Sequence, residues 1–290
     1  MSNGAEVGST ITNSGSRMAV STFSLITIVV FALPSIHEER TVKSIKDIIP
    51  YVEKMAQNYG NDNVCIIYDI DNTLITNSGK YASESWGYWQ ENKSKNYASQ
   101  LLDDSNANIH DYLNAIRYFI DYDMVELDTT KIVNALQKKY PSIALTSRDF
   151  GSEAATSRQL VINGIDFSKH PIGTGEFDNT YLEVNKYGDD YSMYINGIQY
   201  AAGGNKGKLL RTLINKERFK TNNPKLCQGI VYLDDTKSKV DTITQELKDH
   251  FNYYALHYTN LPNPELSKNW KVAQWHNESQ VVQNLVDRLN

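Results

Sequence analysis

The sequence lacks the features that would point to nucleic acid or to metal binding by Cys and His. It has no basic run or stripe, and its net charge is −5 with a pI near 5.7, which argues against nucleic acid as the main partner. Its 2 cysteines and 6 histidines show no metal-ligand spacing. Cys65 and Cys227 each lie in or beside an apolar run, so we expect two buried free thiols.

The uncharged apolar run at residues 18–33 is shorter than the roughly 20 residues that a membrane helix needs, so we expect no stable transmembrane span. One interpretation is a secretory signal that ends near residue 32, although Arg17 is the only positive side chain before it. A strand at the edge of a sheet is the alternative. We therefore treat residues 1–34 as a leader or as a disordered or edge segment.

The most informative stretch is a short apolar run followed by acids. Residues 64–68 predict a strand buried on both faces, and Asp69 and Asp71 follow it directly. On a continuing strand, two acids two positions apart point to the same side. Such a pair stays ionised beside a cation, or else one acid holds a proton. Both states suit a nucleophile on a metal with a general acid nearby.

The rest of the chain alternates between strand and helix patterns, which predicts an α/β fold with a mainly parallel sheet. Asn196-Gly197 between strand-forming runs predicts a type I′ hairpin. Further strands are predicted at 141–145, 229–233 and 253–258, and helices at 35–60, 147–163, 206–214, 236–247 and 281–289.

Residues 74–140 contain helical apolar stripes and no good buried strand, so we interpret residues 77–139 as a helical insertion over the strand ends. The core would then comprise residues 35–76 and 140–290. Trp86 and Trp89 lie inside the insertion. They could stack on a substrate or simply pack the insertion, and the sequence leaves this open.

Each of three predicted central strands ends in polar residues, and Lys206 opens the helix before the third of these strands. Taken together, these residues form an ordered set. In chain order the set is Asp69 and Asp71, Thr146, Lys206, and then Asp234 and Asp235.

This set resembles the four signatures of the haloacid dehalogenase (HAD) superfamily. Those signatures are Asp-x-Asp-x-Thr, a Ser or Thr, a Lys, and an acidic pair, and the resemblance spans residues 64–235. It implies a HAD-like Rossmannoid three-layer fold with an α-helical C1-type cap. It also implies a Mg²⁺-dependent phosphomonoester hydrolase, because halogen-cleaving members lack an acid at the position of Asp71.

The resemblance also implies a role for each residue. Asp69 would bind Mg²⁺ and attack phosphorus, giving a phospho-aspartyl intermediate. Asp71 would protonate the leaving oxygen, later activate water, and offer its backbone carbonyl to the metal. Thr146 and Lys206 would bind the phosphoryl group as it is transferred.

Three assignments stay open in the sequence. Asp235 is the first choice for the remaining metal ligand, with Asp234 on the metal or just behind it. Lys208 is a local rival of Lys206, although the glycine-rich context favours Lys206. Arg148 is either a second phosphate contact or a structural ion-pair residue.

A narrower resemblance rests on residues 160–167 and on the segment 197–207. Both look like a bacterial HAD branch that includes secreted effectors acting as phosphotyrosine phosphatases. A protein phosphotyrosine substrate is thus the leading expectation, for an exported protein or a translocated effector. The alternatives are a small-metabolite phosphatase and a catalytically silent phosphate- or protein-binding module.

Overall fold

The structure, a computed structural model, describes residues 35–77, 114, 117–175 and 192–260. These residues belong to one compact unit that begins at Ser35. The apolar run at 18–33, the tryptophans of the insertion and the helix expected at 281–289 lie outside the described residues. Most of the predicted cap does too, so the cap remains a prediction.

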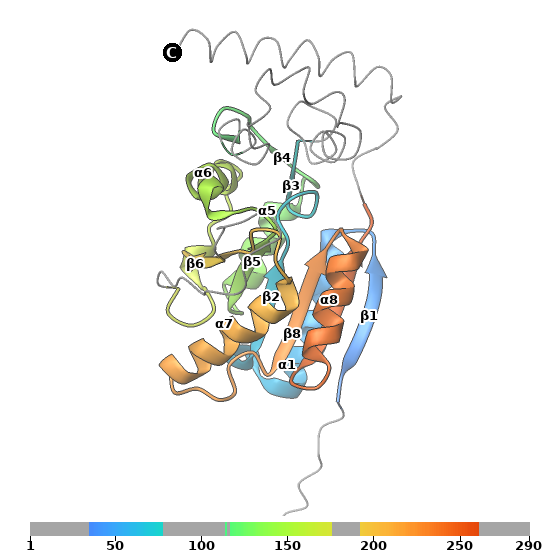
Figure 1. Ribbon diagram of the computed structural model, residues 1–290. Helices are drawn as coiled ribbons and strands as arrows, with labels where there is room; N and C mark the ends of the chain where they lie inside the picture. The colour runs from blue at the N-terminus through green and yellow to red at the C-terminus, as the bar shows by residue number, and fades with distance from the viewer. Residues whose placement is uncertain (1–34, 78–113, 115–116, 176–191, 261–290) are drawn as a thin grey trace, which may run out of the picture. The chain divides into compact units, whose positions relative to one another are not determined.

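Strands and helices alternate along the described chain, as Figure 1 shows. The strands are β1 (His37–Val42), β2 (Val64–Tyr68), β3 (Ile75–Thr76), β4 (Asp123–Met124), β5 (Ser142–Thr146), β6 (Met193–Ile195), β7 (Ile198–Tyr200), β8 (Gly229–Asp234) and β9 (Asn252–Tyr258). The α-helices are α1 (Ile49–Tyr59), α5 (Thr129–Gln137), α6 (Glu153–Ile162), α7 (Lys206–Lys220) and α8 (Lys237–Leu247). Short 3₁₀ turns occupy Ile45–Ile48, Asn61–Asn63, Phe150–Ser152 and Phe167–Lys169.

Seven strands form the central sheet in the order β1-β9-β8-β2-β5-β7-β6. All neighbouring pairs are parallel except β6 with β7. The predicted α/β class and the mainly parallel sheet are confirmed. The short strands β3 and β4 form a separate antiparallel pair.

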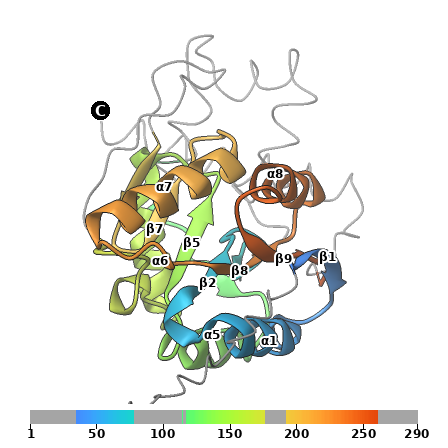
Figure 2. The same ribbon diagram turned by 90° about the horizontal axis from the view of Figure 1, so that it is seen from below.

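Helices cover both faces of this sheet, because its central strands are apolar on both sides (Figure 2). Successive β2 side chains alternate between two cores. Ile66 packs in a core shared with α1 and α5. Ile67 packs in the opposite core, which α7 and α8 cover. Residues 35–260, where described, contain no helix long and apolar enough to cross a membrane.

Local sequence signals explain several element ends. Pro50 lies in the first turn of α1, and Gly60 ends that helix with a φ of 82°. The hairpin β6–β7 turns at Asn196 and Gly197, whose φ values of 53° and 75° fit the predicted type I′ turn. A Cβ at Gly197 would collide with the backbone of Phe167, so glycine also permits a close approach there.

Two secondary-structure predictions were wrong. Residues 37–42 form the edge strand β1 rather than the start of a helix. This segment is polar and half exposed, and its parallel pairing with β9 decides its conformation. Within 74–140, the two-residue strands β3 and β4 escaped prediction, because two residues are too few to show a period.

The expectation of free thiols was also wrong. Cys65 and Cys227 form a disulfide, with their Cα atoms 4.9 Å apart. The bond joins β2 to the loop that leads into β8. β2 and β8 are neighbouring strands in the sheet. The two residues are 162 positions apart in the chain, so no local pattern announced their proximity.

Reduction of this disulfide should destabilise the protein. The free energy of unfolding should fall by about 3–5 kcal/mol, because the unfolded chain regains the freedom of a long closed loop. Urea titration of the wild type with and without reductant measures this change. The double variant Cys65→Ala/Cys227→Ala is the control and should not respond to reductant. An unchanged wild-type midpoint, with thiol titration showing an opened bond, would contradict the prediction.

Candidate active site

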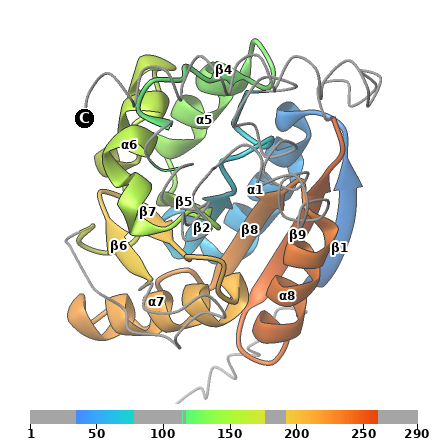
Figure 3. The ribbon, with the colours of Figure 1, turned by 45° about the horizontal axis from the view of Figure 1, so that its top comes forward.

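The predicted site residues lie at the carboxyl edge of the sheet, where the chain reverses its direction of winding. After β2 the chain continues to β5 on one side, and after β8 it continues to β9 on the other. Figure 3 shows β2 and β8 side by side between these neighbours. Ligands of open α/β sheets bind at such a switch point.

Asp69 is the first residue after β2, and it is 6% exposed. Its backbone N–H donates to the carbonyl of Leu233 in β8 at 2.8 Å, which fixes its position between the two strands. The ammonium of Lys206 donates to Oδ1 at 2.6 Å. The hydroxyl of Thr73 donates to Oδ2 at 3.3 Å.

The structure distinguishes Lys206 from its local rival. Lys206 opens α7 and is buried, whereas Lys208 is exposed. The side chain of Asn205 caps the helix by accepting from the backbone N–H of Lys208 at 3.1 Å. Gly207 lets this first turn approach α8, because a Cβ there would lie 2.5 Å from the carbonyl oxygen of Thr242.

Asp234 is completely buried, and both of its carboxylate oxygens are occupied. Lys206 donates to Oδ2 at 2.7 Å, and the hydroxyl of Tyr232 donates to the same oxygen. The backbone N–H of Thr236 donates to Oδ1 at 2.7 Å. Lys206 therefore bridges Asp69 and Asp234.

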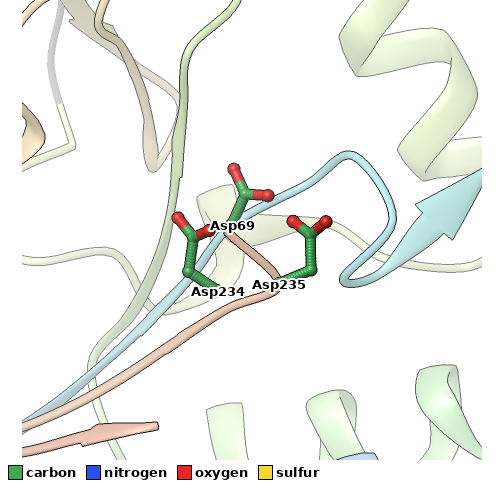
Figure 4. Close-up of side chains that lie close together, drawn as sticks. All are labelled: Asp69, Asp234 and Asp235. Atoms are coloured by element: carbon green, nitrogen blue, oxygen red, sulfur yellow. The ribbon is translucent and has the colours of Figure 1, made fainter. Parts of the chain in front are cut away.

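Asp235 completes a cluster of three carboxylates (Figure 4). Ligand oxygens of Asp69, Asp234 and Asp235 all lie within 4.8 Å of one another. The backbone N–H of Asp235 donates to the hydroxyl of Thr73 at 3.1 Å. Carboxylate oxygens are the donors that hard divalent cations such as Mg²⁺ and Ca²⁺ prefer, so the cluster could hold one.

The electrostatics of the cluster favour added positive charge. Burial raises the pKa of Asp69 to about 7, and Lys206 opposes this shift while Asp234 and Asp71 add to it. Burial would lower the pKa of the Lys206 ammonium, but the charges of Asp234 and Asp69 raise it. Lys206 contacts two of the three carboxylates in the cluster, and a cation would relieve the repulsion that remains among them.

Asp71 lies outside the carboxylate cluster. Its Oδ1 accepts from Nη2 of Arg148 at 2.7 Å, and its Oδ2 accepts from Nε at 2.8 Å. Burial would raise the pKa of Asp71, but the charge and hydrogen bonds of Arg148 hold it below its ordinary value. Of the two interpretations of Arg148, the structure shows the ion pair.

Thr146 ends β5, the strand beside β2, and is completely buried. Its hydroxyl accepts from the backbone N–H of Arg148 at 3.1 Å. The predicted residues thus form two groups at one sheet edge. Lys206 joins Asp69 to Asp234, and Arg148 contacts Asp71 through its side chain and Thr146 through its backbone N–H.

Three contributors to the site received no role in the sequence analysis. Thr73 belongs to the Asp-x-Asp-x-Thr string and contacts both Asp69 and Asp235. Tyr232 lies two residues before Asp234 on β8, a spacing that places both side chains on one face. His257 places Nε2 3.0 Å from the carbonyl oxygen of Asp235, a contact that no local pattern indicated.

Comparison with known proteins gives one match. Residues 41–288 match the model of a family described as "Protein of unknown function (DUF2608)". The chain belongs to the DUF2608 family. No curated protein and no solved structure matches it. The description of the DUF2608 family assigns no activity, so the function of this member has to be argued from its site.

Removing the bridging charge should destabilise this DUF2608 protein. Lys206→Met keeps an apolar stem but leaves Asp69 and Asp234 without their shared counter-charge. We expect the free energy of unfolding to fall by about 3–5 kcal/mol, measured by urea titration at neutral pH in EDTA. The matched control Lys208→Met changes an exposed position of the same helix turn and should stay within about 0.5 kcal/mol of the wild type. Equal stability of the two variants would contradict the claim that Lys206 stabilises the fold by neutralising Asp69 and Asp234.

Proposed function

We propose that the protein is a Mg²⁺-dependent phosphomonoester hydrolase with a HAD-like fold and a helical cap. The proposal rests on one observation. Asp69, at the end of the central strand, shares Lys206 with Asp234 and lies within one group of three carboxylates. This arrangement provides a nucleophile, a cation for the phosphoryl oxygens and a place for a metal ion.

The chemistry explains why the site needs this charge. A phosphate monoester dianion repels an anionic nucleophile, and its uncatalysed hydrolysis is among the slowest biological reactions. Positive charge close to the phosphoryl oxygens lowers that barrier. Bound Mg²⁺ would supply such charge in addition to that of Lys206. In the proposal, Thr146 binds the phosphoryl group beside Lys206.

The reaction has two steps. An oxygen of Asp69 bonds to phosphorus while the bond to the leaving oxygen breaks, and that oxygen takes a proton from Asp71. Water then attacks phosphorus and gives a proton to Asp71 as the bond to Asp69 breaks, which releases inorganic phosphate. The pair with Arg148 favours the carboxylate form of Asp71 that the second step uses. A phosphate dianion beside Asp71 favours the protonated form that the first step uses.

The contacts of the acidic pair support Asp235 as the direct metal ligand. Both oxygens of Asp234 already accept hydrogen bonds from Lys206, Tyr232 and Thr236. Asp234 would then orient Lys206 from just behind the metal. Asp69 and the backbone carbonyl of Asp71 would complete the protein ligands.

The disulfide supports an oxidising location. Cys65 and Cys227 are both completely buried and bonded to each other. Disulfides form and persist mainly in secreted or periplasmic proteins. This favours an exported protein, in agreement with the interpretation of residues 18–33 as a signal.

Hydrolysis of p-nitrophenyl phosphate tests the proposed activity. We expect turnover with Mg²⁺, none with EDTA, and a loss of at least about 1,000-fold in kcat for Asp69→Asn, which keeps the shape but removes the nucleophile. Asp241→Asn is the matched control, because it changes an exposed acid on α8, and it should retain full activity. Turnover that persists in Asp69→Asn, or its absence from folded wild type with Mg²⁺, would contradict the proposal.

Phosphotyrosine is the proposed substrate group, and peptides with matched flanks test it. We expect kcat/KM for a phosphotyrosine peptide to exceed that for the phosphoserine peptide by about 10-fold or more. If Trp86 and Trp89 stack on the phenyl ring, Trp89→Leu should lower this preference by up to about 10-fold. Equal rates for phosphotyrosine peptides, phosphoserine peptides and sugar phosphates would overturn the substrate assignment.

A further inference from the structure

Arg148 makes a two-point contact with Asp71. None of the four sequence signatures includes Arg148 or predicts this contact. Nε and Nη2 of the guanidinium each donate to a different oxygen of the carboxylate, at 2.8 Å and 2.7 Å. A bidentate contact of this kind fixes the plane of the carboxylate as well as its position. Asp71 lies in the loop after β2, and its isolated bridge with Ile75 fixes the backbone but not the plane of the carboxylate.

A buried polar frame holds Arg148 itself in place. Its remaining nitrogen, Nη1, donates to the hydroxyl of Thr156 at 2.9 Å and to Oε1 of Gln159 at 2.8 Å, both on α6. The guanidinium lies over the ring of Tyr122, 5.2 Å from its centroid. The side chain of Arg148 is 1% exposed. A surface pair would leave both side chains free to rotate, whereas this pair has a single geometry.

These contacts argue against Arg148 as a phosphate ligand. All three guanidinium nitrogens already donate to Asp71, Thr156 or Gln159. Four of the five guanidinium N–H groups are thereby used, so a two-point contact with a phosphate would have to displace a buried partner, which is costly. Phosphate contacts are already assigned to Lys206 and Thr146.

From this geometry we infer that Arg148 is a positioning residue, which sets the orientation in which Asp71 transfers protons. The inference rests on the proposed function. Arg148 contacts the carboxylate oxygens of Asp71 and, in the proposal, not the substrate, so it acts on the reaction through Asp71. A lysine cannot replace it, because an ammonium lacks the planar fork that grips both carboxylate oxygens.

The test uses two substrates that depend on Asp71 differently. 2,4-Dinitrophenyl phosphate has a leaving group that departs without a proton, whereas an alkyl phosphate needs an acid. For Asp71→Asn and Arg148→Lys, we expect kcat/KM on the dinitrophenyl ester to remain near the wild-type value. Hydrolysis of the phospho-enzyme should slow by about 100-fold, so that a burst of dinitrophenol precedes a low kcat. On the alkyl phosphate, kcat/KM should fall by about 100-fold.

A double-variant cycle separates positioning from an independent role. Asp71→Asn/Arg148→Lys should be no slower than Asp71→Asn alone, because both changes remove the same contribution. Arg158→Lys is the matched control: its pair with Asp121 is largely exposed, and both substrates should react as in the wild type. If Arg148→Lys does not fold, Thr156→Val replaces it in the test. This variant removes one of the two acceptors that hold Nη1 of Arg148 and so loosens the side chain without removing it. It should give the same pattern with a smaller change.

The outcomes are distinguishable. Equal losses on both substrates without a burst, or effects that multiply in the double variant, would overturn the positioning role while leaving the phosphatase intact. If the wild type shows no turnover, or turnover that does not require Asp69, the proposed function is overturned. The role of Arg148 is then overturned with it.

Discussion

The site depends on the two ion pairs that the ammonium of Lys206 makes with Asp69 and Asp234. The ammonium lies 2.6 Å from an oxygen of Asp69 and 2.7 Å from an oxygen of Asp234, and all three side chains are buried. Two carboxylates this close repel each other strongly outside water. The lysine offsets that repulsion and so allows β2 and β8 to present acids side by side. Lys206 lies in the first turn of α7, so its ammonium links α7 to the ends of β2 and β8.

A second buried cation organises the other half of the site. Arg148 grips Asp71, and its frame on α6 is independent of the lysine bridge. After β2 the backbone turns tightly over residues 70–75, where the amides of residues 73–75 donate to the carbonyl of Ile70. Two acids two residues apart therefore occupy separate environments. Burial raises the pKa of Asp69, whereas Arg148 lowers that of Asp71.

The contacts of the two acids support the roles that we propose for them. The acid in the cluster with the lysine and the acidic pair is placed to be the nucleophile, and the acid held by the arginine is placed to transfer protons. In the absence of a cation and a substrate, these two pKa shifts run against the proposed roles, because the nucleophile must be ionised and the general acid protonated. A cation beside Asp69 would lower its pKa, and a phosphate dianion beside Asp71 would raise that of Asp71.

The sequence predicted those parts of the molecule that local pattern controls. The buried strand β2 and the turn at Asn196 follow from short stretches with clear periodicity or turn chemistry. The glycine-rich context favoured Lys206 over Lys208, and the structure buries Lys206 against Asp69 and Asp234. The sequence failed where distant partners decide the structure. The edge strand β1 takes its conformation from β9, and Cys65 finds a partner 162 residues away.

The sequence left the partner of Arg148 open for the same reason. The residue was visible beside Thr146, but its contact with Asp71 joins positions 77 apart in the chain. A pattern within one strand or helix cannot reveal which of two plausible anions, a phosphate or a carboxylate, such a cation will bind. The folded arrangement of β2, β5 and α6 decides it.

Direct detection of a phosphorylated Asp69 would test the account at its centre. Protein mixed with Mg²⁺ and substrate is quenched, treated with borohydride to reduce any aspartyl phosphate to homoserine, digested and analysed by mass spectrometry. The account predicts homoserine at position 69 only, and only when substrate and Mg²⁺ are both present. Homoserine at another aspartate, or none at position 69 while substrate turns over, would contradict it.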